Sequence, residues 1–427
     1  MMTLTRSLLL AASATVLASC TNLMPLYERP AAPIPDTLPL TEAQAEMVAP
    51  LRWEQLVVSP ELRQLIELAL DENRDLMIAA QNVQLARARY GLADTSLLPR
   101  VVAGGSVTEA GTFTGGGGNI ARQSASDSAS AQIAVSAYEL DLFGRIANQT
   151  ESALQSYFAT VEGDRAARIT IVSAIAQAWL QLAADREFLA LAEDTVSSQT
   201  ESLDLTNELF DAGVATELDV RRASASVETA KAQSAQFKAA IDQDMNALRF
   251  LVGADLPAGT RAAAKLSPLP IAATLPVGQS SDLLLSRPDV IAAERNLIAA
   301  HADIGAARAA FFPTISLNGN AGYASTGLDD LFDGFGLYSF GPQISLPIFD
   351  GGARQRNLDI TEAQQKIAVA QYEQAIQTAF REAADALAVS STIDDRVASL
   401  ERLVEDYAVT MNLSEEHFKS HQTAWAS

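Results

Sequence analysis

The chain offers few side chains that could catalyse a reaction or bind a metal ion. It holds one cysteine, Cys20, and three histidines: His301, His417 and His421. A zinc or nucleophilic site needs several such groups at close and specific spacing. The sequence has no His-Glu-x-x-His motif and no cysteine pair, and carboxylate pairs such as Asp329-Asp330 are typical of turns and solvated surfaces. We therefore expect a protein that is not an enzyme and that uses no metal or cofactor.

Cys20 points to a different chemistry, the attachment of a lipid. An apolar run from Leu8 to Ala18 follows Arg6. This run is shorter than the about 20 residues that a membrane-spanning helix needs, and it is typical of a secretory signal. The run leads to Leu17-Ala18-Ser19-Cys20, which resembles the bacterial lipobox, where the signal is removed and the new N-terminal cysteine is acylated. The simpler alternative is a small apolar residue next to a cleavage site.

The charge of the chain excludes one class of partner. The formal net charge is −22 over 427 residues, with the acidic residues spread along the chain. Nucleic-acid binding needs clustered lysine and arginine. The sequence therefore predicts no nucleic-acid partner.

Two halves of the chain repeat each other at a constant offset, which indicates an internal duplication. The matched pairs include Asp75 with Asp289, Asn82 with Asn296, Gly91 with Gly305, and Pro99 with Pro313. Each repeat reads as helix, strand, loop, strand and long helix. We expect a signal peptide at 1–19, a lipid-anchored extended segment at 20–60, a first repeat at 61–255, a linker at 256–282 and a second repeat at 283–427.

Each repeat contains two short segments in which apolar and polar residues alternate. The expected strands lie near 101–108, 132–143, 314–323 and 343–348. This alternation is typical of membrane strands with one lipid face and one lumen face, although a half-buried soluble sheet gives the same pattern. We predict that Ile315, Leu317, Ile344 and Ile348 face lipid or barrel neighbours, whereas Ser316 and Asn318 face the lumen. Four strands cannot close a barrel, so several chains must share one.

The helical segments are unusually long. Between Ile146 and Asp211 there is no proline and one glycine, Gly163, and a helix of that span is about 100 Å long. A seven-residue apolar ladder indicates coiled-coil-like packing. It runs through Ile175, Leu182, Leu189, Val196, Leu203 and Phe210, and it returns in the second repeat as Val397, Val404, Met411 and Phe418. The predicted fold is mainly α with β, with long helical hairpins and four strands per chain.

A tight turn separates the long helix of the first repeat from a return helix that reaches about Leu251. Gly213 suits the left-handed position after a helix, and Thr216 with Asp219 forms a capping-box pattern. Three acidic residues near this turn are candidates for a cation-attracting gate or for a helix cap: Asp211, Glu217 and Asp219. For Asp219 the capping role is favoured.

The second repeat lacks the counterpart of that turn. On the repeat register Gly213 corresponds to His421, and Asp219 corresponds to Ser427. About 35 residues that would match the return helix are missing. We therefore expect the chain as given to be C-terminally truncated and impaired in assembly.

These features together resemble the outer-membrane efflux protein family, of the TolC type, and specifically its OprM/NodT lipoprotein branch. The motifs that carry the resemblance are Cys20-Thr-Asn-Leu-Met-Pro-Leu-Tyr-Glu-Arg-Pro30, Ala69-Leu-Asp-Glu-Asn-Arg-Asp-Leu76, Tyr138-Glu-Leu-Asp-Leu-Phe-Gly-Arg145 and Phe210-Asp-Ala-Gly-Val-Ala-Thr-Glu-Leu-Asp219. The resemblance implies a homotrimer with a shared outer-membrane β-barrel and a periplasmic α-barrel. It also implies docking on a periplasmic adaptor and an inner-membrane pump of the RND type.

In that family the tip of the periplasmic hairpin contacts the adaptor, and the corresponding residues here are Gly213, Val214, Ala215 and Thr216. The resemblance implies passive exit of small molecules through the duct. Two alternatives stay open: an exit duct for type I protein secretion, and a structural periplasmic lipoprotein without a pore.

Overall fold

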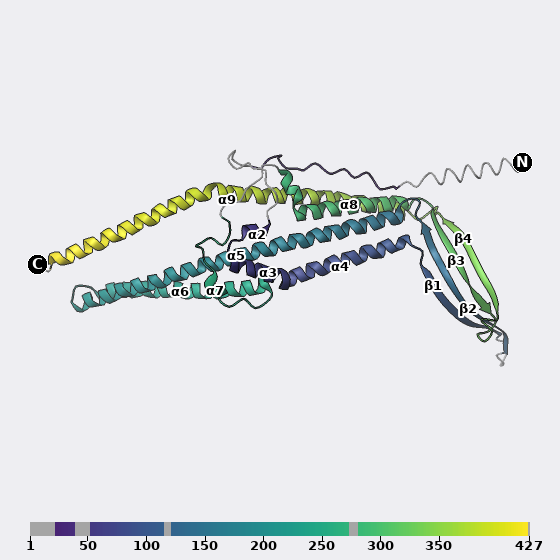
Figure 1. Ribbon diagram of the computed structural model, residues 1–427, viewed down its shortest axis with the longest axis horizontal. Helices are drawn as coiled ribbons and strands as arrows, with labels where there is room; N and C mark the ends of the chain where they lie inside the picture. The colour runs from purple at the N-terminus through teal and green to yellow at the C-terminus, as the bar shows by residue number, and fades with distance from the viewer. Residues whose placement is uncertain (1–21, 39–51, 115–120, 273–280, 426–427) are drawn as a thin grey trace.

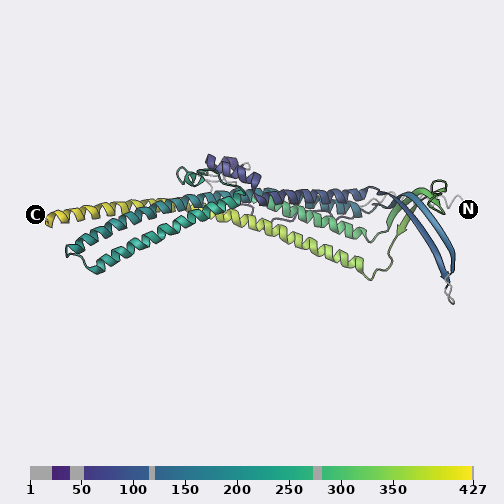
Figure 2. The same cartoon turned by 90° about the horizontal axis from the view of Figure 1, so that it is seen from below.

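The computed structural model describes residues 22–38, 52–114, 121–272 and 281–425. The molecule is a long rod, with a β-sheet at one end and helices that run side by side along the rest of its length (Figure 1). The tip of the hairpin formed by α5 (Arg145–Asp211) and α6 (Glu217–Val252) and the end of α9 (Ala353–Trp425) lie at the end opposite the sheet, as a second view also shows (Figure 2).

The elements follow the predicted order in both repeats. The first repeat contains α3 (Pro60–Glu72), α4 (Arg74–Asp94), η2 (Thr95–Leu97), β1 (Val101–Thr114), β2 (Ala121–Leu140), α5 (Arg145–Asp211) and α6 (Glu217–Val252). The second contains α8 (Pro288–Ala309), β3 (Thr314–Ser325), β4 (Phe335–Ser345) and α9 (Ala353–Trp425). The short elements α2 (Trp53–Leu56), α7 (Thr260–Ala263) and η3 (Ser281–Ser286) lie outside these units. The predicted fold class, long helical hairpins with four strands, is confirmed.

The predicted bounds of three strands, β1, β2 and β4, were wrong. β2 begins at Ala121 and ends at Leu140, whereas the sequence pattern placed it at 132–143, and β1 continues to Thr114. The small residues between the two predicted strands pair backbone to backbone, as Gly111 does with Ala125, because small residues do not prevent a ladder. β4 ends at Ser345, and Ile348 lies beyond it, after a proline that cannot donate to a ladder.

The helices enclose two apolar clusters. The first lies where α3 covers the middle of α5 and α6, with Leu62, Trp179, Leu182 and Leu248 at its centre. The second joins α8 to α9 through Val290, Leu297, Tyr372 and Ile376. The first cluster is built mainly from helices of the first repeat and the second from helices of the second, and α5 packs against α8 between them.

An N-terminal strap, residues 22–38, lies along α8 and α9 (Figure 1). Leu38 and Ile34 of the strap pack into the second apolar cluster, and one carboxylate binds its polar side chains. Glu294, 8% exposed on α8, accepts bonds from Arg29 Nε and Nη2 at 2.7 and 2.8 Å and from the Tyr27 hydroxyl at 3.1 Å. Burial raises the pKa of Tyr27, so its hydroxyl stays a donor. The Tyr27 ring also meets His301 edge-on, with 5.4 Å between ring centroids.

The equivalent glycines of the two repeats have different surroundings. A Cβ atom added at Gly305, in α8, would lie 2.5 Å from Nδ2 of Asn148 and 2.8 Å from the backbone of Met24. A Cβ added at Gly91, in α4, would meet no atom within 4 Å. The second repeat therefore uses its glycine to bring α5 and the strap close, whereas the space over Gly91 is open in a single chain.

Candidate functional site

The four strands form one antiparallel sheet in the order β1-β2-β3-β4. Its outermost strands, β1 and β4, have no further partner strand in the described part of the chain. An open edge presents unpaired backbone N–H and C=O groups, which lipid does not tolerate and which soluble proteins usually shield. Both outer strands are therefore able to pair with further strands.

One face of the sheet is apolar and exposed. The register places Ile133, Ala321 and Tyr338 opposite one another, and the same face carries Phe340 and Ile344. Tyr338 is 87% exposed, Phe340 75% and Ile344 68%. Large side chains exposed side by side in this way are typical of a lipid-facing surface. The register puts Ile315 and Leu317 on this face and Ser316 and Asn318 on the other, as predicted.

The opposite face carries neutral polar side chains that bond across the strands. Asn320 Nδ2 donates to Gln132 Oε1 at 2.9 Å, and the Ser339 hydroxyl donates to Asn320 Oδ1. A second row begins where Asn318 Nδ2 donates to Gln343 Oε1 at 3.3 Å. These amides would suit a water-filled lumen, because a side-chain amide both donates and accepts. The alternation of the sequence predicted the face but not the cross-strand bonds.

A bulge in β2 interrupts the ladder next to the helices. The register shifts between Val135 and Tyr138, and Ala137 adopts a φ of 53°, which is rare for a residue with a Cβ atom. The N–H of Ala137 donates to Asn318 Oδ1 at 2.8 Å and so remains satisfied. Bulges bend and twist a strand, and this one lies just before β2 ends and leads into α5.

At the other end of the molecule, the α5–α6 turn is built as the sequence predicted. Gly213 has a φ of 78°, and Thr216 and Asp219 form a reciprocal capping box. The hydroxyl of Thr216 bonds to Asp219 at 2.6 Å, and this bond above all lowers the pKa of the Asp219 carboxyl. Glu217 pairs with Arg221 at 3.1 Å on the exposed surface.

The turn also exposes apolar side chains. Val214 is 74% exposed and Leu218 58% exposed, beside the exposed Asp211. These side chains have no partner large enough to cover them within the described chain. The geometry brings the predicted tip residues together, and their role as adaptor contact or gate stays a prediction.

The seven-residue ladder is more deeply buried in α5 than in α9. In α5, Ile175 and Leu182 are fully buried, Leu189, Val196 and Leu203 are half-buried, and Phe210 near the turn is 43% exposed. In α9 the residues that match Leu189, Val196 and Leu203 are exposed: Val397 is 45% exposed, Val404 68% and Met411 63%. The side chain of Phe418 lies outside the described residues. In α5 the ladder has α6 beside it, because the chain turns back at Gly213; His421, at the matching position of α9, is helical. The α9 ladder is thus a coiled-coil seam open to another helix.

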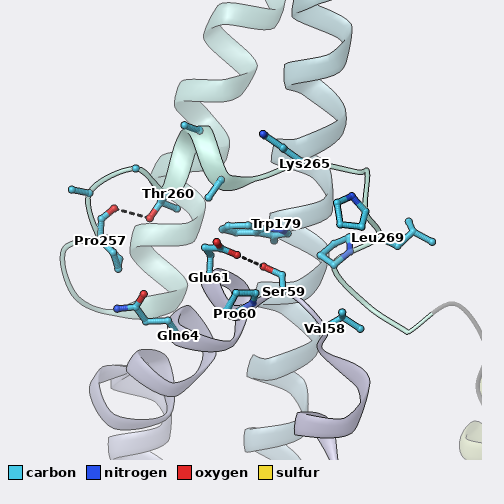
Figure 3. A pocket seen from close by; sticks show the side chains of 16 residues that line it. Val58, Ser59, Pro60, Glu61, Gln64, Trp179, Pro257, Thr260, Lys265 and Leu269 are labelled. Atoms are coloured by element: carbon cyan, nitrogen blue, oxygen red, sulfur yellow. Dashed lines mark hydrogen bonds between the residues drawn. The ribbon is translucent and has the colours of Figure 1, made fainter.

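A cavity of about 800 Å³ lies beside the first apolar cluster, between α3 and the segment that follows α6 (Figure 3). Trp179 lies in the middle of this view, with Glu61 below it and Lys265 above it. Four prolines contribute to its wall: Pro60, Pro257, Pro268 and Pro270. Among the described residues no group of three or more His, Cys, Asp or Glu could hold a metal ion, here or elsewhere.

Two further observations concern the membrane. Cys20, the predicted lipid attachment point, lies outside the described residues. By length and composition alone α5 is apolar enough to cross a membrane, but it packs against α4, α6 and α8 as part of the helical bundle.

Comparison with known proteins gives one consistent result. The family model for outer membrane efflux proteins matches residues 65–254 and 280–420. The probable efflux pump outer membrane protein TtgC of Pseudomonas putida is 38% identical over 97% of this chain and 87% of its own length. A membrane protein from Pseudomonas aeruginosa superimposes with a TM-score of 0.84 at 38% identity, covering 94% of this chain and 91% of its own.

A third relative is a channel whose structure was solved in the open state. The open state of the MtrE outer membrane channel of Neisseria gonorrhoeae superimposes with a TM-score of 0.78 at 34% identity, covering 90% of this chain and 85% of its own. The match extends over the sheet and the long helices, the features described above. The chain belongs to the outer membrane efflux protein family.

Proposed function

We propose that this chain is one protomer of an outer-membrane duct in a tripartite efflux system, through which small molecules leave passively. The observation that carries the proposal is the sheet: one exposed apolar face, one face of neutral amides and hydroxyls, and two open edges. Copies of the chain joined edge to edge would close these edges into one barrel, with lipid outside and water inside. The relatives are channel and efflux proteins, and on this proposal the chain is a duct and not an enzyme.

The proposed duct is a homotrimer that extends into the periplasm, where a periplasmic adaptor and an inner-membrane pump of the RND type join it. The adaptor would contact the hairpin tip at Gly213, Val214, Ala215 and Thr216. Exposed Val214 and the adjacent Leu218 supply apolar surface for such a contact. Asp211 and Glu217 would present negative charge at the same end, whereas the capping bond of Asp219 supports a structural role for that residue.

The anchor and the division of the chain belong to the same proposal. Cys20 would carry the lipid after removal of 1–19, and 20–60 would lead from the membrane to the first repeat at 61–255. The linker at 256–282 and the second repeat at 283–427 would follow. The docking of the strap on α8 supports a path from the membrane along the outside of the helices. Mass spectrometry of the mature N-terminus tests the acylation.

Thiol labelling in intact outer membranes tests the duct against a pore-free spacer. Asn318→Cys lies on the amide face and Phe340→Cys on the apolar face. A membrane-impermeant maleimide should react with Asn318→Cys and not with Phe340→Cys. A spacer in the aqueous periplasm would expose Phe340→Cys, and reaction there at the same rate would refute the duct.

A further inference from the structure

Two aspartates meet inside the α5–α6 hairpin, away from the sheet and the tip. Asp185, on α5, is 7% exposed, and its Oδ2 accepts a bond from Gln181 Nε2 at 3.0 Å. Asp244, on α6, has its Oδ2 buried with no donor group to bond it. The two carboxyls are within bonding reach of each other. They border the first apolar cluster, to which Leu182 and Ile241 belong.

This contact needs a proton. Ionised carboxylates only accept hydrogen bonds, so two of them repel, and they bond only when one is protonated. Burial, the hydrogen bond to Asp185 and the charge of Asp185 raise the pKa of Asp244 from 3.8 to about 6.

Among the described residues, no cation lowers the pKa of Asp244. On α5, Arg186 donates to the carbonyls of Ala262 and Ala264. On α6, charged side chains near the pair are engaged elsewhere, Lys238 with Glu193 and Asp242 with Arg261. The helix α3 presents an apolar face to this core, and its acidic Glu67 and Asp71 are exposed. Lys265, after α7, lines the cavity described above.

We propose that Asp185 and Asp244 form a shared-proton carboxyl pair that makes the α5–α6 hairpin respond to pH. With one proton the pair bonds α5 to α6. Without it, two like charges face each other at a half-buried contact and push the helices apart. The proposal rests on these contacts alone and does not depend on the proposed function.

The sign follows from proton linkage. The folded chain holds the Asp244 proton more tightly than an unfolded chain does, because its pKa is raised. The stabilisation is complete below the ordinary pKa of 3.8, declines as the pH rises, and is lost above about 6. The hairpin is therefore tighter at acid pH and looser at neutral pH.

The pair lies far from the hairpin tip, and a change in the contact between the two helices at the pair affects the tip. Asp185 lies 26 residues before the end of α5, about 40 Å from the turn at 1.5 Å per residue. When the contact between the helices loosens at the aspartate pair, two continuous helices transmit the change to the tip: Arg145–Asp211 and Glu217–Val252.

Hydrogen exchange on the purified full chain in detergent, read by mass spectrometry, tests the pair. Each variant is compared with the parent chain at the same pH, so the intrinsic pH dependence of exchange cancels. At about pH 7.5, peptides covering 241–252 should exchange roughly tenfold more slowly in Asp244→Asn than in the parent. The raised pKa sets a ceiling of about a hundredfold, which partial exposure reduces. At about pH 3.5, below the ordinary pKa of 3.8, the two chains should agree within about twofold.

Two further variants make the result decisive. Asp185→Asn removes the other charge and should slow exchange at about pH 7.5 in the same way. This second variant keeps the test valid if Asp244→Asn fails to fold. Asp194→Asn, at an exposed aspartate of α5, should behave as the parent at both pH values. If neither pair variant slows exchange at neutral pH, or if the slowing is as large at about pH 3.5, the shared-proton pair is refuted.

Discussion

Asn73 Nδ2 donates to the backbone carbonyl of Leu251 at 2.6 Å, and so one side chain joins the start of α4 to the end of α6. The Oδ1 of the same residue accepts from the N–H groups of Asp75 and Leu76, which caps α4. Asn73 is 3% exposed. Three hydrogen bonds to this buried amide therefore hold the junction. A bulky apolar contact in the same place would not fix the two helix ends.

Replacing Asn73 tests this junction. Asn73→Ala removes the cap and the bond to Leu251, so we expect about 1–3 kcal/mol lower stability. Asn73→Ser keeps a capping oxygen and loses only the bond to Leu251, and it should fall between the parent and Asn73→Ala. Thermal unfolding followed by circular dichroism gives the order. Equal losses in the two variants would show that the capping oxygen contributes nothing, and an Asn73→Ser variant as stable as the parent would show that the Leu251 bond contributes nothing.

Two glycines with the same backbone conformation should respond differently to alanine. Gly213 and Gly253 have φ values of 78° and 76°, and each change places a Cβ in the left-handed region at a cost of about 1–2 kcal/mol. At Gly253 the new Cβ would also lie 2.5 Å from the carbonyl oxygen of Glu72, whereas at Gly213 it meets nothing within 4 Å. We expect Gly253→Ala to lower the unfolding temperature more than Gly213→Ala; the reverse order would contradict the close contact.

Adjacent positions of β4 test the assignment of the sheet faces. Phe340 lies near the middle of the strand on the apolar face, and Gly341 lies on the amide face with open space above it. An arginine on a lipid face costs about 2–4 kcal/mol near the midplane. Phe340→Arg should therefore reduce the amount of protein assembled in the outer membrane, measured after urea washing, while Gly341→Arg should assemble nearly as the parent does. Equal yields would argue against lipid on the Phe340 face.

The strap should come loose when its carboxylate is removed. Glu294→Ala leaves Arg29 and Tyr27 without their shared acceptor. Chymotrypsin should then cut after Tyr27 several-fold faster than in the parent, because a released segment fits a protease and a docked one does not. Glu28→Ala, at an exposed neighbour, is the matched control and should leave the cleavage rate unchanged.

Much of this architecture was predictable because the sequence repeats itself. The duplicated register, the seven-residue ladder and the Thr216–Asp219 box predicted long helices with a tight turn between α5 and α6, and the structure has them. These signals are local, and periodicity or capping chemistry reports them directly.

Contacts between distant segments were not predictable in the same way. The Asp185–Asp244 contact joins positions on two helices whose relative rotation the ladder alone does not fix. The extent of β2 was missed because Ala, Ser and Gln have weak strand preference, and pairing with β1 and β3 decides the outcome. Ala137 in the left-handed region has no sequence signal, since glycine or asparagine is the usual residue there.

The unequal surroundings of Gly91 and Gly305 have a genetic consequence. A larger residue at Gly305 collides with Asn148 and the strap inside its own chain, so its damage should be recessive, since the misfolded copy is lost before it meets others. A larger residue at Gly91 meets nothing in its own chain and leaves a folded protomer. If another copy packs over α4, such a protomer joins assemblies that also contain parent protomers, and it impairs those assemblies. Substitutions at two positions that descend from one ancestral glycine should therefore differ in dominance.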